Sequence, residues 1–471
     1  MKASLLATFI AALLAGCAST AIDDNRSATS DFARDKLSVT PRWLDSAEAQ
    51  REARAETDAL LQQPLTLEAA QSIALRYSPA FQALQADAAT SSARITQSAR
   101  ISNPLFTFEK LVRLEDGVRD LDIGRMLTVS LFELITLPAR LRIADSQQQR
   151  LRMVSAGNAL QTVTDVRQAW LRAVAANEAQ GYHQQVMDLA DAAAELAQRM
   201  QAAGNFSRLQ RMRQQGFYAE AAAELVRARG AANDARESLV RLLGLDAAQA
   251  AQLKLPARLP DLPGTPRDEA ALSQTALDER LDLRLARFDL EATAREQGLT
   301  RVESVVNGLH VSGVRNSATG KTTQRGYELE FPLPVFDTGD ARRAGAQATY
   351  LAAFHRAAQA GVDASSQVRQ HYQRYRDAYD LARHYRDEIL PLRKLASEEM
   401  QLKYNGMLIG VFDLLADARG QVTSVIATLN AQRDFWLADA ALQATLLGKP
   451  ASITTDMPQA ASTAGADSGG H

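Results

Sequence analysis

The only cysteine of this 471-residue chain, Cys17, closes the motif Leu14-Ala15-Gly16-Cys17 after a short apolar stretch that follows Met1-Lys2. A charged start, an apolar stretch and a small-residue cleavage site are typical of a secretory signal. A cysteine in this position indicates lipid attachment, palmitate included, at Cys17 once residues 1–16 are removed. Ala18 follows where an aspartate would favour retention at the inner membrane, so we expect the outer membrane. The alternative is an ordinary secretory signal with an incidental cysteine.

The other residues that could do chemistry form no catalytic motif. Gly320-Lys321-Thr322 is similar to the end of a phosphate-binding loop, but Arg315 stands where the first glycine belongs. The six histidines have neither the HExxH pattern nor paired metal-ligand spacing. Met400 and Met407 leave passage of soft metal ions open as an alternative to ordinary packing. We therefore predict no enzyme activity, no cofactor and no bound metal.

The charge balance adds no nucleic-acid partner, because 53 basic and 55 acidic residues are interspersed along the chain. Alanine, glutamine, arginine and leucine dominate the composition, and aromatic residues make up only 6% of it. Such a composition favours long helices.

The chain is duplicated. The glycine of Ala203-Gly204-Asn205-Phe206 recurs in Asn405-Gly406-Met407-Leu408, at an offset of 406 − 204 = 202 residues. Leu242-Leu243-Gly244 recurs as Leu446-Leu447-Gly448, at an offset of 448 − 244 = 204. A steady offset predicts two similar structural units. The expected segments are a signal peptide 1–16, an N-terminal arm 17–64, a first repeat 65–250 with a β-hairpin at 104–135, a linker 251–266, a second repeat 267–448 with a β-hairpin at 305–335, and a disordered tail 449–471. We expect the arm to be irregular and extended, with a short charged helix after Pro41-Arg42-Trp43.

Within the repeats, the pattern predicts long helices. Thr66 can cap a helix that runs to about Arg100. Apolar residues at Val163, Val166, Trp170 and Val174 have helical spacing, and a helix over 139–201 would be a rod of roughly 95 Å. Val368, Tyr375, Ala382 and Ile389 recur every seven residues, which favours coiled-coil packing over an ordinary helical bundle. The remaining helices are expected at 206–245, 267–303, 340–403 and 408–447, with Pro138 marking the return from strand to helix in the first repeat.

The hairpin segments alternate between polar and apolar residues. Thr128 and Ser130 lie between leucines and a valine, and Glu328 and Glu330 lie between Tyr327, leucines and Phe331. In a transmembrane barrel the polar positions face a watery lumen, whereas in a soluble sheet they face solvent, and the alternation fits both. Four strands are too few to close a barrel. A pore therefore requires oligomerisation, and three copies would supply twelve strands.

These features together resemble the TolC family of outer-membrane efflux channels, and the lipid anchor resembles its lipoprotein branch. The motifs that carry the resemblance are Leu65-Thr66-Leu67-Glu68-Ala69-Ala70, Ser102-Asn103-Pro104, Phe336-Asp337-Thr338-Gly339, Lys403-Tyr404-Asn405-Gly406 and Phe412-Asp413-Leu414-Leu415. The resemblance implies a mainly α fold with a small β part: duplicated helix, β-hairpin and long-helix units, with a homotrimer forming a 12-stranded transmembrane β-barrel on a 12-helix periplasmic α-barrel.

The resemblance also implies roles for particular residues. The turns at the periplasmic tip would contact an adaptor, a membrane fusion protein, and would be formed by Gly204, Asn205, Phe206, Gly406, Met407 and Leu408. Asp413 and Asp417 would line the closed entrance, where three symmetry-related carboxylates favour cations. The alternative for Asp413 is a carboxylate at the start of a helix, where the helix dipole favours negative charge.

The expected function is a passive conduit that exports small toxic compounds, driven by an inner-membrane pump. A heavy-metal channel, for example for copper ions, is a variant of this hypothesis. The alternative of a different class is a lipid-anchored periplasmic coiled-coil adaptor without a pore.

Overall fold

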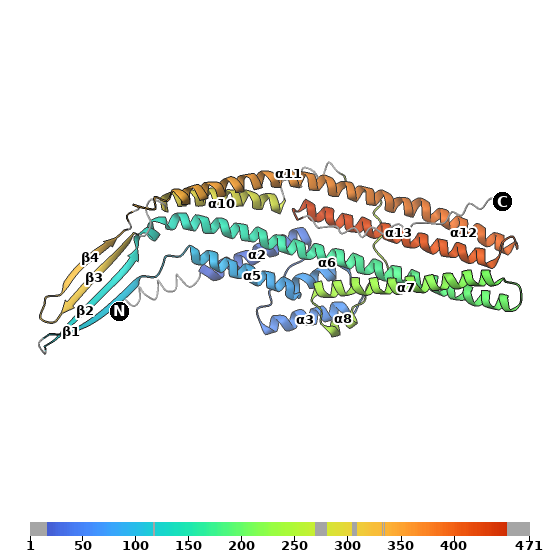
Figure 1. Ribbon diagram of the computed structural model, residues 1–471, viewed down its shortest axis with the longest axis horizontal. Coiled ribbons are helices and arrows are strands. Elements are labelled where there is room, and N and C mark those ends of the chain that lie inside the picture. Colours follow the sequence, from blue (N-terminus) through green and yellow to red (C-terminus); the bar gives the residue numbers. More distant parts are fainter. Residues whose placement is uncertain are drawn as a thin grey trace.

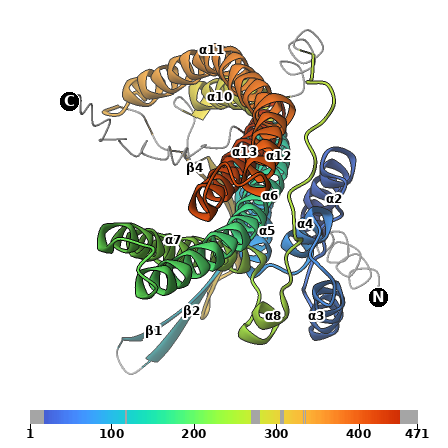
Figure 2. The same ribbon diagram turned by 90° about the vertical axis from the view of Figure 1, so that its right-hand side faces the viewer.

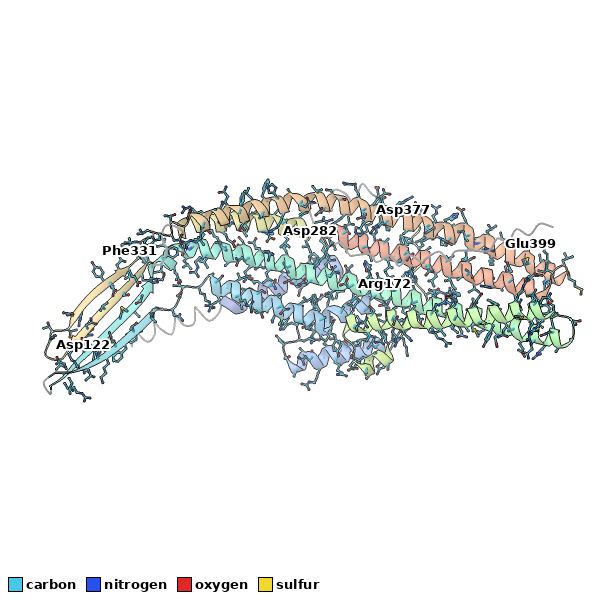
Figure 3. All side chains as sticks on the ribbon, in the orientation of Figure 1. Asp122, Arg172, Asp282, Phe331, Asp377 and Glu399 are labelled. Carbon is cyan, nitrogen blue, oxygen red and sulfur yellow. The ribbon has the colours of Figure 1, made fainter. Side chains whose placement is uncertain are left out.

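The computed structural model describes residues 17–115, 118–268, 280–303, 309–331, 333 and 335–449. The described chain is a long rod with a β-sheet at one end and the turns of two helical hairpins at the other (Figure 1). Asp122 in the sheet and Glu399 near the turns mark the two ends (Figure 3). The expected signal peptide, the tail after Lys449 and parts of the expected helix 267–303 and hairpin 305–335 lie outside the described residues.

The N-terminal arm is more helical than expected: the short charged helix after Trp43 is present, but the residues before Pro41, expected to be irregular, also form a helix. It forms α2 (Cys17–Leu37) and α3 (Ala47–Leu61). Ser46 caps α3, since its side chain accepts a hydrogen bond from the Ala49 N–H at 3.1 Å. The side chains that α3 buries are spaced four residues apart, which places them on one helix face: Ala53, Thr57 and Leu61.

The expected helix from Thr66 to Arg100 is two helices, α4 (Leu67–Arg76) and α5 (Pro79–Ser98). The Thr66 cap is confirmed, because its hydroxyl accepts from the Ala69 N–H at 3.2 Å. The break follows from Pro79, which has no N–H to donate and keeps the residue before it out of the helical conformation. The hydroxyl of that residue, Ser78, donates to the carbonyl of Leu242 at 2.9 Å.

The sheet has the order β1-β2-β3-β4, formed by β1 (Leu105–Glu115), β2 (Val118–Ser130), β3 (His310–Ala318) and β4 (Gln324–Glu330). All three strand pairs are antiparallel. The two repeats contribute one hairpin each and join between β2 and β3, where the Thr128 and Ser312 hydroxyls lie 2.9 Å apart. Strand β2 ends at Ser130, not at 135, because Ser130 caps the helix that follows by accepting from the Glu133 N–H at 3.3 Å.

The first repeat continues with α6 (Leu131–Ala202), a single helix of 72 residues that holds Pro138 inside it, so Pro138 does not mark the start. After it come α7 (Arg208–Leu243) and the short α8 (Ala247–Gln252). The second repeat has α10 (Leu281–Glu303), α11 (Asp340–His384), a π-helical turn η1 (Tyr385–Ile389), α12 (Leu390–Asn405) and α13 (Val411–Leu446). Pro391 explains the wider turn, since its ring would clash with the carbonyl of Asp387 in a regular α-helix.

The long helices pack in a curved row in the order α11, α13, α6 and α7, and α2, α3 and α4 lie to one side of it (Figure 2). Of the residues with predicted helical spacing, Val163, Val166, Trp170 and Val174 are all buried. Trp170 also donates from its indole N–H to the carbonyl of Leu65 at 2.8 Å. In the second repeat the heptad residues Val368, Tyr375 and Ala382 are buried, whereas Ile389, in the π-helical turn, is only half-buried.

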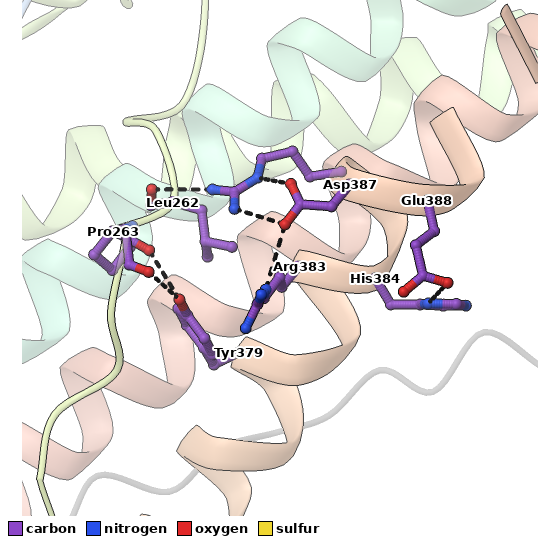
Figure 4. Close-up of polar contacts among 9 residues, drawn as sticks. Leu262, Pro263, Tyr379, Arg383, His384, Asp387 and Glu388 are labelled. Carbon is purple, nitrogen blue, oxygen red and sulfur yellow. Dashed lines mark hydrogen bonds and ion pairs between the residues drawn. The ribbon is translucent and has the colours of Figure 1, made fainter. Parts of the chain in front are cut away.

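The segment between the repeats crosses the middle of the rod and is fixed there by side chains of the long helices. The indole N–H of Trp436 donates to the Pro260 carbonyl at 2.9 Å. The Tyr379 hydroxyl lies 3.1 Å from the Pro263 carbonyl and 2.9 Å from that of Gly264, next to the π-helical turn (Figure 4). This strap, residues 253–267, therefore ties α11 and α13 together at mid-length.

None of the helices in the described ranges has both the length and the apolar character that crossing a membrane requires.

Candidate functional site

The first turn at the far end of the rod lies between α6 and α7. Gly204 has φ +77°, and the N–H of Asn205 donates to the carbonyl of Met200 at 2.9 Å while that of Gly204 donates to Gln201 at 3.0 Å. This pair of bonds is the Schellman motif, in which the residue after the C-cap takes the left-handed conformation. Ser207 then caps α7 through a reciprocal capping box with Gln210.

The second turn, between α12 and α13, has the same motif with a different residue in the strained position. Met407 has φ +58°, while Gly406 is the C-cap at φ −78°. The Leu408 N–H donates to the Lys403 carbonyl, and that of Met407 to Tyr404, both at 2.9 Å. The structural equivalent of Gly204 is therefore Met407, at an offset of 407 − 204 = 203, and the glycine match that indicated the duplication is displaced by one residue.

The two turns lie side by side. The rings of Phe206 and Phe412 stack with centroids 4.6 Å apart and an interplanar angle of 23°. Beyond this stack, Met407 is 93% exposed and Leu408 is 75% exposed. Gly204, Asn205 and Gly406 are exposed as well. The expected tip residues thus form one surface with exposed apolar side chains. The sequence analysis did not predict that Phe412 stacks on Phe206. An aromatic side chain beside each of the two turns could have indicated this contact.

The expected gate carboxylates differ in their surroundings. Asp413 is exposed in the first turn of α13, and its Oδ2 accepts the Gly410 N–H at 3.0 Å. This contact is the helix-start role that was the alternative to a gate. The Oδ2 of Asp417 is buried and has no hydrogen-bond partner among the described residues. Buried carboxylate oxygens without a partner are rare, so this oxygen of Asp417 stands out as a polar atom that the described residues leave unsatisfied.

The strand residues expected to face a lumen share one side of the sheet. The register pairs Thr128 with Ser312 and Ser312 with Glu328, and in the next polar row it pairs Ser130 with His310 and His310 with Glu330. Directly paired residues of antiparallel strands point to the same face. The sheet therefore has a polar face with two aligned rows across three strands. Ser312 and His310 were missed by the sequence analysis, although the alternation that singled out Glu328 also runs through β3.

The opposite face of the sheet is apolar and uncovered. Its side chains are large and solvent-exposed: Phe106, Phe108, Val112, Leu114, Leu127, Val311, Tyr327 and Leu329. No helix packs over this face in the described chain (Figure 1). Among the described residues, no group of three or more His, Cys, Asp or Glu side chains is arranged to hold a metal ion.

Several ionisable groups are buried along the rod, away from both ends, among them Arg280, His371 and Asp439. His371 is 5% exposed, and burial, with smaller effects of Arg374 and Arg280, lowers its pKa. Burial also lowers the pKa of Arg167, whose guanidinium donates to the Gln443 amide oxygen at 2.5 Å. The Arg167 contact joins α6 to α13, whereas the buried Nδ1 of His371 has no hydrogen-bond partner among the described residues.

Neither a scan of family models nor a search of curated proteins gives a match for this chain. Solved structures do match it. The outer-membrane channel OprN has a TM-score of 0.67 at 17% identity over 83% of this chain and 92% of that one. The outer membrane protein VceC from Vibrio cholerae has 0.66 at 16%, over 86% and 99%.

The open state of the MtrE outer membrane channel from Neisseria gonorrhoeae has a TM-score of 0.64 at 18% identity, over 81% of this chain and 89% of that one. The resemblance to the TolC family is thus confirmed at the level of the fold: the chain is mainly helical with a small sheet and has the fold of these outer-membrane channels.

Proposed function

We propose that the chain is the channel subunit of an efflux system in the outer membrane. The observation that carries this proposal is the four-stranded sheet with one polar and one exposed apolar face at the end of a long helical rod. Apolar surface of this extent is unfavourable in water, and in a membrane it would face lipid while the polar face lines water. The fold shared with outer-membrane channels supports the same orientation.

Three copies would assemble the pore. Among the described residues, strand β1 pairs only with β2, and β4 only with β3, so both edges of this sheet present unpaired backbone groups. Exposed strand edges pair with further strands, and pairing β1 of one copy with β4 of the next closes twelve strands in a homotrimer. The long helices of the three copies would continue the barrel as a periplasmic tunnel.

The remaining assignments follow from this orientation. Lipid on Cys17 would anchor the mature chain to the outer membrane. The tip surface around Gly204 and Met407 would bind a periplasmic adaptor that connects to an inner-membrane pump. The channel itself would be passive and would export small toxic compounds that the pump delivers.

Single-channel recording tests the proposal. The mature protein, purified in detergent from outer-membrane extracts, should have the mass of a trimer and give discrete conductance steps in planar bilayers. Neutralising the polar face with Glu328→Gln and Glu330→Gln should lower its preference for cations, since rings of carboxylates favour cations. Glu48→Gln, which changes an exposed carboxylate of α3, is the matched control and should leave the preference unchanged. A monomer, or a trimer that does not conduct even after Asp413 and Asp417 are neutralised, would refute the channel.

The same recording tests the gate. We propose that Asp413 and Asp417 narrow the tunnel entrance, so that Asp413→Ala and Asp417→Ala should raise conductance. If both variants leave conductance and cation selectivity unchanged, these carboxylates only support the start of α13.

A further inference from the structure

Acidic side chains lie on only one face of the described strands. The strand register places Glu109, Asp120, Asp122, Glu328 and Glu330 on the polar face, together with one cation, Arg113, which pairs with Asp120. The apolar face carries only cations among its described strand residues: Lys110, Arg119, Arg125, Arg315 and Arg325. A sheet that exposed both faces to water would have no reason to sort its charges in this way.

Three of these cations form a row. Arg125 pairs directly with Arg315, and Arg315 pairs directly with Arg325. Neighbouring strands lie about 4.8 Å apart, so the three guanidinium groups share one short stretch of surface across β2, β3 and β4. Arg315 and Arg325 are exposed, and Arg125 is half-exposed. No ion pair or hydrogen bond joins any of these three side chains to another described residue.

Like charges directly opposite one another destabilise a strand pair, and an arginine on a lipid-facing surface costs further free energy. The row therefore favours a bound anion, and the described strand residues place no carboxylate on this face. The carboxylates of the sheet cannot neutralise the three arginines, because their strand positions direct them to the other face.

Beside the row the apolar face has a gap. The next row toward the helices on this face is Phe106, Leu127, Gly313 and Tyr327. A Cβ atom added at Gly313 would meet no atom within 4 Å, while Leu127 and Tyr327 on either side are exposed. An open strip of backbone between two apolar side chains can accommodate a hydrocarbon chain.

We propose that the arginine row, Arg125, Arg315 and Arg325, binds the phosphates of lipid A, with an acyl chain along the gap at Gly313. This inference rests on the proposed function, since it requires the apolar face to meet the membrane. Guanidinium groups bind phosphate through two parallel hydrogen bonds. Arg325 is the second residue of β4, at the end of the strand away from the helices, which places the row toward the outer leaflet and selects its phosphorylated glycolipid.

The experiment measures binding of fluorescent lipid A to the purified full-length mature protein in detergent. The triple variant Arg125→Gln, Arg315→Gln, Arg325→Gln should bind about 100-fold more weakly, from about fivefold for each arginine near anionic lipid. Lipid A without its phosphates should bind the unmodified protein as weakly as lipid A binds the variant. Millimolar inorganic phosphate should not displace the lipid, because it lacks the acyl chain.

A second triple variant, Arg113→Gln, Arg119→Gln, Lys321→Gln, removes the same charge from the sheet outside the row. Arg113 lies on the polar face, Arg119 lies six residues before Arg125 in β2, and Lys321 lies in the turn between β3 and β4. This variant should bind lipid A with an affinity within about threefold of the unmodified protein, because the charges that it removes lie too far from the bound phosphates to contact them and are screened by salt. Equal losses in both variants, equal binding of dephosphorylated lipid A, or full displacement by inorganic phosphate would each overturn the proposal.

Conductance of the same samples separates the two proposals. Trimers that conduct but bind lipid A independently of the row refute the lipid site alone. Protein that never conducts but binds lipid A through the row refutes the channel and leaves the lipid site standing.

Discussion

Replacing Met407 with glycine should stabilise the turn between α12 and α13. Met407 is one of two described non-glycine residues with positive φ, at +58°, and it occupies the position that Gly204 fills in the first turn. A left-handed conformation costs a residue with a Cβ about 1–2 kcal/mol. Glycine removes that cost but loses about 0.5–1 kcal/mol through the greater freedom of the unfolded chain. The net gain is about 0.5–1 kcal/mol.

Hydrogen exchange measures this gain at the bonds that define the turn. The Leu408 N–H, which donates to the Lys403 carbonyl, should exchange about threefold more slowly in Met407→Gly, because 0.5–1 kcal/mol corresponds to a factor of about two to five. The equivalent N–H of Asn205 in the first turn reports on the unchanged structure and should keep its rate.

Met407→Ala is the matched control, since it shortens the side chain but keeps the Cβ and therefore the strain. It should leave the exchange of Leu408 unchanged, whereas both variants should weaken adaptor binding if the 93% exposed side chain makes that contact. Faster exchange in Met407→Gly, or an equal slowing in Met407→Ala, would show that the backbone strain assigned to Met407 is absent.

Three further predictions concern the rod. Gly244→Ala should destabilise by about 1–3 kcal/mol more than Gly204→Ala, because both have positive φ but only at Gly244 would the new Cβ collide with Pro79; equal thermal unfolding midpoints would contradict this. His371 has a lowered pKa, so its neutral form favours folding, and the free energy of unfolding should fall as the pH drops through about 6.5. In His371→Leu the thermal unfolding midpoint should therefore depend less on pH in this range. Tyr379→Phe should lower the free energy of unfolding by about 1–2 kcal/mol, because the strap carbonyls of Pro263 and Gly264 lose their donor. Faster proteolysis of the strap would measure this loss.

The sequence predicted the elements whose periodicity extends over many residues. Trp170 and Val174 lie in the core because helical spacing over a long segment leaves only one face to bury. The repeat was detectable for the same reason. Its exact alignment was not, since a glycine in a turn does not reveal whether it is the C-cap, as Gly406 is, or the left-handed residue after it, as Gly204 is.

The site was less predictable because its properties depend on register. Alternation showed that Glu328 and Glu330 share a face, but only the pairing with β3 aligns them with Ser312 and His310. The row formed by Arg125, Arg315 and Arg325 could not be predicted for the same reason, because the three arginines belong to three strands that two distant hairpins bring together. Alternation within one strand contains no information about its neighbours.

The distribution of unsatisfied groups along the rod indicates where the chain needs partners. At mid-length, side chains such as Tyr379 are fully buried and hydrogen-bonded to the strap, although Gln168 and His371 each keep one buried nitrogen without a partner among the described residues. At the sheet, two strand edges and an apolar face remain open, and at the tip Met407 is strained and exposed. Folding free energy comes mainly from buried apolar surface, which the middle supplies. In the proposed assembly the surfaces at both ends would be covered by other chains, so replacing a buried side chain at mid-length should alter the stability of the single chain, whereas replacing an exposed apolar side chain at either end should alter its association.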